Sequence, residues 1–437
     1  MRTGRVFVWG GFALLLAVLP LVFRGGLALT MLSQMAIAIV ACLSYNMLLG
    51  QGGMLSFGHA VYSGLGSFVA VHALNRIGDG SLPIPVSLIP LVGGLAGIFF
   101  AVLLGFVTTK KAGTPFAMIT LGIGELVFAM SLMIPEFFGG EAGVSANRSA
   151  GKPFLGITYG PQIQVYYLLA VYTLLCTAAM YAFTHTPLGR MLNAVRDNPE
   201  RVAFIGYNTQ RVRYIAFIIA GFFAGIAGGM YAMNFEIATA EVVGAARSGG
   251  YLLFTFLGGA TFFFGPIIGG ALMVLAFVLL SEFTKAWLLY LGLIFLLMVM
   301  YAPGGIASLI MMNVRVASHG KLRRLLPHYA ALLATGVLAL IGVAALIEMI
   351  YHLQLEAGAD SSLRFLGVTL DVASVGSWLS ALAVAAAGFA LFEWVRRRFA
   401  RLWGDVQGEI AHESRQREDA ALDAASELGG DRSHAAA

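Results

Sequence analysis

Long apolar runs separated by short polar segments dominate the chain. A transmembrane helix needs about 20 consecutive apolar residues. Runs of this kind predict helices at residues 6–23, 27–49, 54–74, 84–109, 115–135, 164–184, 212–235, 248–264, 267–283, 286–302, 329–350 and 372–394. The pattern therefore indicates an all-α integral membrane protein, a polytopic helical bundle of about ten core transmembrane helices plus a C-terminal two-helix hairpin.

The apolar run at residues 248–283 is too long for one helix. Gly265 and Pro266 divide it, because this pair can end one helix and begin the next. With this division, the basic cluster from Arg315 to Arg324 falls on the same side as the other Lys-rich and Arg-rich segments, as the positive-inside rule requires. We therefore expect both the N-terminus and the C-terminus in the cytoplasm.

The longest polar interruption among the first 300 residues is TPLGRMLNAVRDNPERVAFIGYNTQRVRYIAF, residues 186–217. It carries five arginines and two acids, so the charge excess places it on the cytoplasmic side. Charge alone does not distinguish this segment from an ordinary Arg-rich inner loop.

Helix-capping residues give the same segment a defined shape. Thr186 is followed by Pro187, and Asn198 by Pro199, so each pair predicts an N-cap and the first residue of a short helix. Gly206 predicts a left-handed stop. Two short capped helices form a surface suited to a cytoplasmic partner.

The composition agrees with a membrane protein and excludes several other classes. The 437 residues are 59% hydrophobic and only 11% charged, which is too few charges for a soluble globular surface. The net charge of +5 follows the membrane topology and indicates no nucleic-acid binding. Cys42 and Cys176 lie in apolar stretches and suit small buried side chains better than a disulfide or a metal site.

Motifs for catalysis are absent from the sequence. It contains no G-x-x-x-x-G-K-[ST] loop, no H-E-x-x-H and no G-x-S-x-G. We therefore expect no ATPase site in this chain, no catalytic residue, no metal and no cofactor.

Three stretches resemble the membrane subunits of branched-chain amino acid ABC importers. They are LSYNMLLGQGGMLSFGHAVYSGLGSFVA (residues 43–70), TPFAMITLGIGELVF (114–128) and PLGRMLNAVRDNPERVAFIGYNTQRVRYIAFIIAGFFAGIAGGMYA (187–232). The resemblance covers about residues 27–312. It implies a permease subunit that moves branched-chain or related amino acids across the bacterial inner membrane, driven by ATP hydrolysis in partner subunits.

The resemblance also implies an assembly. The expected partners are two ATP-binding subunits, a second homologous permease subunit or a second copy of this chain, a periplasmic amino-acid-binding protein and membrane lipid. The segment Gly139–Arg148 (GGEAGVSANR) is a candidate surface for the binding protein, or a solvated glycine loop. The alternatives are a secondary transporter of small polar solutes, or an ABC permease for urea, amides or other small acids. A secondary transporter has no use for the paired short helices.

Glu200, Ala203 and Gly206 stand where the family's ATPase-coupling loop has its E-x-x-x-x-x-G pattern. The full set of expected coupling residues is Leu188, Gly189, Arg190, Arg196, Glu200, Arg201, Ala203 and Gly206.

Polar residues in the other two family-like stretches are candidates for a substrate path. Gly50, Gly52 and Gly53 predict a helix break, and a broken helix inside a membrane exposes backbone N–H groups that can hold a carboxylate. The candidate path residues are Gln51, Ser56, His59, Thr120 and Glu125. Glu125 is expected to face the bundle interior, either on the path or as a structural partner of a group such as His59.

The chain is expected to divide into three parts. Residues 1–312 form the permease core, 313–400 an additional transmembrane hairpin and 401–437 an acidic cytoplasmic tail. Residues 404–437 hold eight acids and few large apolar residues, so the tail is expected to form a marginal helix or to be disordered.

Overall fold

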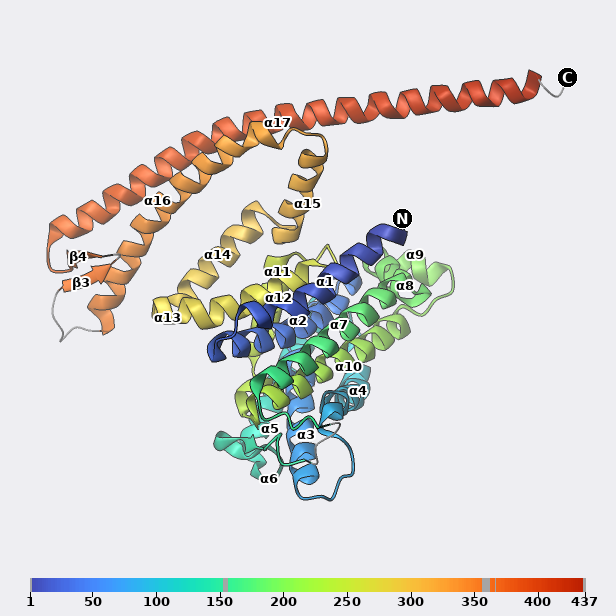
Figure 1. Ribbon diagram of the computed structural model, residues 1–437, viewed down its shortest axis with the longest axis vertical. Helices are drawn as coiled ribbons and strands as arrows, with labels where there is room; N and C mark the ends of the chain where they lie inside the picture. The colour runs from blue at the N-terminus through green and yellow to red at the C-terminus, as the bar shows by residue number, and fades with distance from the viewer. Residues whose placement is uncertain (1, 152–155, 356–361, 366, 435–437) are drawn as a thin grey trace. The chain divides into compact units, whose positions relative to one another are not determined.

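The computed structural model describes residues 2–151, 156–355, 362–365 and 367–434. The chain separates into two compact units, Met1–Leu309 and Ile310–Ala437. Nearly all of both units is helical (Figure 1).

The first unit is a helical bundle. Its helices are α1 (Arg2–Val22), α2 (Gly26–Gly52), α3 (Ala60–Gly78), α4 (Ile89–Thr108), α5 (Thr114–Met133), α6 (Pro135–Phe138), α7 (Gln162–His185), α8 (Pro187–Asp197), α9 (Pro199–Phe204), α10 (Thr209–Phe235), α11 (Ala245–Gly258), α12 (Gly265–Leu275), α13 (Ser281–Phe283) and α14 (Trp287–Tyr301). A π-helical turn at Ala276–Leu280 joins α12 to α13. Two short strands, β1 (Val144–Ser145) and β2 (Ile237–Ala238), pair antiparallel.

Helix α10 lies at the centre of this bundle and packs against α2, α3 and α4. Glycines make its closest approaches possible. A Cβ atom at Gly93 of α4 would lie 2.5 Å from the carbonyl oxygen of Gly225 on α10, and one at Gly66 of α3 would lie 2.8 Å from the same oxygen. The small-residue packing expected for the glycine-rich stretch is therefore present, since only glycine fits at these contacts.

Two helix breaks interrupt the bundle. Residues 53–59 leave the helix after α2, and Gly53 has a φ of +63°. The predicted helix at 54–74 was therefore placed too early, because α3 begins only at Ala60. The second break, after α11, contains Gly259 with a φ of +111°, and the next helix starts at Gly265 with Pro266 in its first turn, as predicted.

The second unit contains α15 (Gly305–Ser318, from Ile310 onward), α16 (Leu322–Leu355), β3 (Ser362–Phe365), β4 (Val368–Asp371) and α17 (Val375–His434). Helices α16 and α17 lie side by side (Figure 1). They approach closely at glycines, since a Cβ atom at Gly388 would lie 2.5 Å from the Ala339 backbone. The antiparallel β3–β4 hairpin and helix α15 were not predicted.

The acidic tail is helical in this unit, because α17 continues through it to His434. Its first part is held in place. Val406 and Ile410 are buried against Val316 and Leu325. Lys321 lies 2.9 Å from Glu409 and 2.7 Å from Glu413, and hydrogen bonds from Glu413 and Glu409 raise the pKa of Lys321. The sequence left a marginal helix and disorder as alternatives because it did not show these partners.

In the part of the chain that the structure describes, eight helices are long and apolar enough to cross a membrane, and α14 with α15 gives a ninth if they form one broken span. The polytopic all-α membrane fold is therefore confirmed. Helices α1, α3 and α11 are not among the eight. The predicted ten core spans include these three and remain a prediction.

Candidate functional site

The polar segment after α7 folds as the two predicted short helices. The Thr186 hydroxyl accepts the N–H of Gly189 at 3.1 Å and begins α8. The Asn198 side chain accepts the N–H of Arg201 at 3.0 Å and begins α9. Gly206 follows with a φ of +90°. The two N-caps and the left-handed glycine are confirmed, and in Figure 1 α8 and α9 lie together at the end of the bundle away from α6.

The predicted coupling residues fall on two faces of this helix pair. Gly189 is buried and Leu188 is half-buried, and they lie beside the buried side chains of Leu192 and Val195. Arg196 is exposed, with 39% of its side chain accessible, although its guanidinium reaches the end of α2. Arg190, Glu200, Arg201, Ala203 and Gly206 are exposed. One face therefore holds the pair to the bundle and the other is open to a partner.

Three apolar side chains on the open face were not among the predicted coupling residues. Phe204 is 88% exposed, Ile205 is 68% exposed, and Tyr207 is also exposed. Apolar residues between Ala203 and Asn208, inside the most polar segment of the bundle, were the signal that could have identified them. An exposed aromatic and aliphatic cluster beside charged residues is typical of a protein interaction surface.

Arg196 connects α8 to the end of α2. Its guanidinium donates a hydrogen bond to the carbonyl oxygen of Gly50 and another to Asp197 at 2.9 Å. Its aliphatic carbons cover Gly53, where a Cβ atom would lie only 2.8 Å from the Arg196 Cγ. Arg196 therefore binds a carbonyl at the negative end of α2 and rests directly on the helix break.

The backbone of the break runs through the bundle interior, and side chains from three helices satisfy its polar groups. The N–H of Phe57 donates to the Thr120 hydroxyl of α5 at 3.1 Å, and the N–H of Ala60 donates to the Ser248 hydroxyl of α11 at 3.0 Å. The Tyr45 hydroxyl of α2 donates to the carbonyl of Ser56 at 2.9 Å. The N–H groups of Phe57 and Ala60 are thus occupied, so these two donors of the break are not free for a carboxylate.

His59, one of the predicted path residues, is enclosed, with 1% of its surface exposed. Its Nε2 lies 2.9 Å from the Ser44 hydroxyl, and its ring packs edge-on against Tyr45. Within the described residues, its Nδ1 and the Ser56 hydroxyl have no hydrogen-bond partner. Ser56, His59 and Thr120 therefore gather around the break, whereas Gln51 is half-buried on the last turn of α2.

Glu125 does not face the bundle interior of this chain, which corrects the prediction. Thr120 and Gly124 take the buried face of α5, and Glu125 lies on the exposed face with Met118 and Gly122. A carboxylate facing hydrocarbon costs about 2.5–3.5 kcal/mol at the bilayer centre. The exposed face of α5 is therefore unsuited to lipid alone.

The segment Gly139–Arg148 is tied to the bundle and is not a freely solvated loop. β1 within it pairs with β2. The Arg148 guanidinium donates to the carbonyls of Met233 at 3.0 Å and Asn234 at 3.2 Å, at the C-terminal end of α10. This contact fixes the segment at the end of α10 opposite the one that follows α9.

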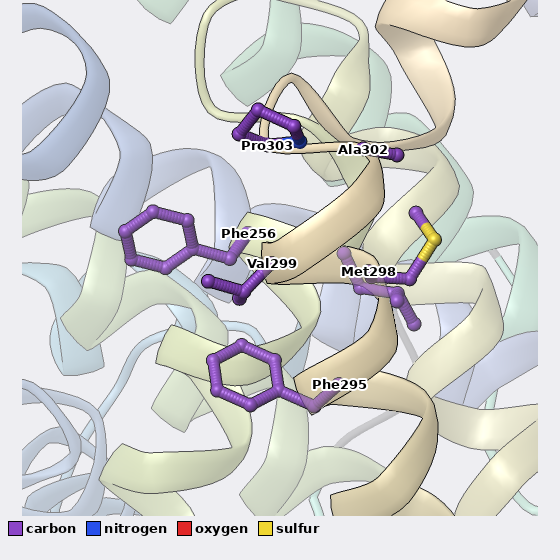
Figure 2. Close-up of a pocket in the computed structure, with 7 residues that line it drawn as sticks. Phe256, Phe295, Met298, Val299, Ala302 and Pro303 are labelled. Carbon is purple, nitrogen blue, oxygen red and sulfur yellow. The ribbon is translucent and has the colours of Figure 1, made fainter.

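A purely apolar pocket of about 80 Å³ lies between α11 and α14. Figure 2 shows Phe256 on α11 and Phe295, Met298 and Val299 on α14 lining it. These side chains carry no charge and no strong hydrogen-bonding group, so the pocket offers nothing to orient a charged amino acid.

A many-helix membrane bundle with a broken helix in its interior and a partner-accessible helix pair at one end has the features of a membrane transport subunit. Comparison with known proteins gives the family. The family described as branched-chain amino acid transport system / permease component matches residues 27–303, and the chain belongs to this family.

Individual relatives agree. The chain is 27% identical over 319 residues to the high-affinity branched-chain amino acid transport system permease protein LivM of Salmonella typhimurium, covering 68% of this chain and 73% of the relative. It is 28% identical over 310 residues to LivM of Escherichia coli, covering 65% and 71%. A shorter match, 32% identical over 73 residues, is to the guanosine ABC transporter permease protein NupQ of Bacillus subtilis, covering 17% and 23%. No solved structure gives a significant match.

Proposed function

We propose that this chain is the transmembrane permease subunit of an ABC importer that moves branched-chain or related amino acids across the bacterial inner membrane. ATP hydrolysis in two ATP-binding partner subunits drives the transport. Family membership supports the transport role. The capped α8–α9 pair with its exposed apolar cluster is the observation that supports coupling to an ATPase.

The segment from Leu188 to Gly206 docks into an ATP-binding subunit. Phe204, Ile205 and Tyr207 fill an apolar groove of that subunit, while Glu200 and Arg201 meet polar groups around it. The buried face of α8 transmits the movement of the ATP-binding subunit to the interior of the bundle. Because Arg196 binds the carbonyl of Gly50 and covers Gly53, displacement of α8 displaces the end of α2 and the broken segment that follows.

A second permease subunit covers the exposed face of α5. Protein or water in place of lipid would accommodate Glu125, and Gly122 allows close approach of another helix, since a Cβ there would meet no described atom within 4 Å. The partner is a homologous permease subunit or a second copy of this chain. Glu125 then lies on a path shared by two subunits, and a periplasmic amino-acid-binding protein delivers substrate at the opposite end from α8 and α9.

Purification from native membranes followed by reconstitution tests the proposal. We expect ATP-binding subunits to co-purify, and the reconstituted complex to take up L-leucine only with ATP and a binding protein. Uptake by the purified chain alone, driven by a proton or sodium gradient, would instead establish a secondary transporter.

A further inference from the structure

Arg247 is a cation inside the bundle that the coupling surface and the helix break do not use. It is the third residue of α11 and half-buried, and its guanidinium carbon lies 4.9 Å from the centre of the Tyr231 ring on α10. Among the described residues, no acidic side chain lies within ion-pair distance of Arg247. A cation in the first turn of a helix opposes the helix dipole. Its position favours an anion as a partner.

A pocket lies on each side of Arg247, and Tyr231, Arg247 and Tyr251 border both. One is mainly apolar and holds about 50 Å³. Its other lining residues are Gln34, Ile37, Ala38, Phe235, Met273, Val274 and Phe277. The other is smaller, about 10 Å³, and adjoins Ser63 and Ser67 of α3. A larger apolar chamber, beside a smaller one that two serines and Arg247 border, suits a solute with an aliphatic part and a charged part.

The smaller chamber contains an unsatisfied donor. The Ser67 side chain is 1% exposed, lines this chamber, and its hydroxyl has no hydrogen-bond partner among the described residues. Gly244, the residue before α11, offers no side chain to cap the first N–H groups of the helix. Arg247, Ser67 and the start of α11 therefore offer donors of the kind that bind a carboxylate.

We propose that this is the substrate site and that it binds the carboxylate of an aliphatic α-amino acid. The carboxylate accepts hydrogen bonds from the Arg247 guanidinium and the Ser67 hydroxyl. The branched side chain enters the apolar chamber, near Ile37, Met273 and Val274. When Arg247 turns from Tyr231 to the carboxylate, the Tyr231 ring becomes free for the substrate ammonium. The inference rests on the proposed function and specifies its site.

The structure corresponds to a closed form of this site. The two chambers together have room for only a few water molecules, less than an amino acid needs. Movement of the Arg247 side chain away from Tyr231 joins them. The residue after Arg247 is Ser248, and its hydroxyl accepts a hydrogen bond from the N–H of Ala60, the first residue of α3. The proposed site is therefore in contact with the broken segment on which α8 packs.

Photolabelling tests this assignment without depending on transport. The full complex in lipid nanodiscs is irradiated with a diazirine analogue of L-leucine, and the labelled peptides are identified by mass spectrometry. We expect label on the apolar chamber, at Phe235, Met273 or their neighbours. L-leucine should compete, whereas L-leucinamide, which lacks the carboxylate, should compete about tenfold less well or worse.

Variants separate recognition from folding. Arg247→Gln should lower labelling about tenfold or more, and Arg247→Lys should retain part of it because one charged donor remains. Ser67→Ala removes an unpartnered hydroxyl without disturbing a packed contact, so it should fold normally and label several-fold less. Arg76→Gln, which removes an exposed arginine at the other end of α3, should label like the wild type.

Three results would overturn the site: equal competition by leucinamide, stronger competition by guanosine, or wild-type labelling in both Arg247→Gln and Ser67→Ala. ATP-binding subunits and ATP-driven leucine uptake are measured on the same preparations. If the wild type has the ATP-binding subunits and takes up leucine, but the substitutions leave the labelling unchanged, only the site assignment fails. If the wild type has neither, the proposed function itself fails.

Discussion

Gly206 has a φ of +90°, and no atom of the described residues lies within 4 Å of where a Cβ would be. Gly206→Val therefore introduces backbone strain, about 1–2 kcal/mol, without a steric collision. We expect the strain to shift the end of α9 and the apolar cluster beside it. ATP hydrolysis should then continue while L-leucine uptake falls, which a coupled assay in proteoliposomes measures.

Gly80 provides a matched control, because its φ is +75° and the space around it is also open. Gly80→Val should strain the chain to a similar degree but lies far in sequence from α9, after α3. Uptake should remain near the wild-type rate. Equal loss of uptake in both variants would mean that general destabilisation, and not docking, explains the Gly206 result.

Arg196 is expected to carry motion from α8 to the helix break. Arg196→Ala removes the hydrogen bond to Gly50 and uncovers Gly53, while Leu192 and Val195 still hold α8 in place. Stability should fall by about 1 kcal/mol, because the side chain is partly exposed. ATP hydrolysed per leucine transported should rise severalfold, and Arg211→Ala, an exposed arginine on α10, should leave the ratio unchanged. An unchanged ratio in Arg196→Ala would remove the proposed link.

How well the sequence predicted the positions of these residues depends on whether their contacts are local or distant in the chain. The caps at Thr186 and Asn198 are local, so the residue types alone located them. Glu125 was placed in the interior because a carboxylate in an apolar run usually faces inward, but Gly124 and Thr120 occupy that side of α5. Arg247 lies directly before the predicted helix at 248–264 and was not singled out from the sequence, because its neighbours on α3, α10 and α12 are distant in the chain.

The helices show the same difference between features set by local sequence and features set by distant contacts. Long apolar runs located most helices, and Gly265-Pro266 correctly marked the start of α12. The glycines at 50–53 correctly predicted a break, but residues 54–59 were assigned to the next helix because they are mostly apolar or small. The contacts that stabilise the break come from Thr120 and Ser248, far along the chain. Helix α17 continues through the acidic tail because of partners on α15 and before α16.

The prediction that a second permease subunit covers α5 can be tested at Glu125. Glu125→Gln keeps the side-chain shape and removes the charge, and the residue is exposed in the single chain, so folding should be unaffected. Leucine uptake should fall about tenfold if the charge lies on the shared path. Cross-linking between permease subunits through cysteines at Gly122 would measure the pairing directly.

Glu136→Gln on α6 is the control for that substitution, since it also removes an exposed carboxylate. Its uptake should match the wild type. If Glu125→Gln also transports at the wild-type rate, and Gly122→Cys forms no cross-link between permease subunits, then α5 does not face a partner.

At the scale of the whole molecule, the unit beginning at Ile310 is expected to be dispensable for transport. It packs as a compact body with its own buried clusters, around Val406 and Met349. A chain ending after Gly320 keeps the whole first unit. It should insert, assemble with its partners and take up leucine within about twofold of the full-length rate. Normal assembly without transport would place the second unit in the mechanism.

The central claim is that α8 and α9 dock an ATP-binding subunit, and the affinity of that subunit for the permease tests it most directly. The permease in nanodiscs is titrated with the purified ATP-binding subunit, comparing the wild type with a Phe204→Ser, Ile205→Ser double variant. Both side chains are already exposed, so the substitutions should not impair folding. Burial of two such side chains contributes roughly 3 kcal/mol or more. Docking through these two side chains should therefore make the Kd of the double variant at least about a hundredfold higher, and an unchanged Kd would contradict docking at this surface.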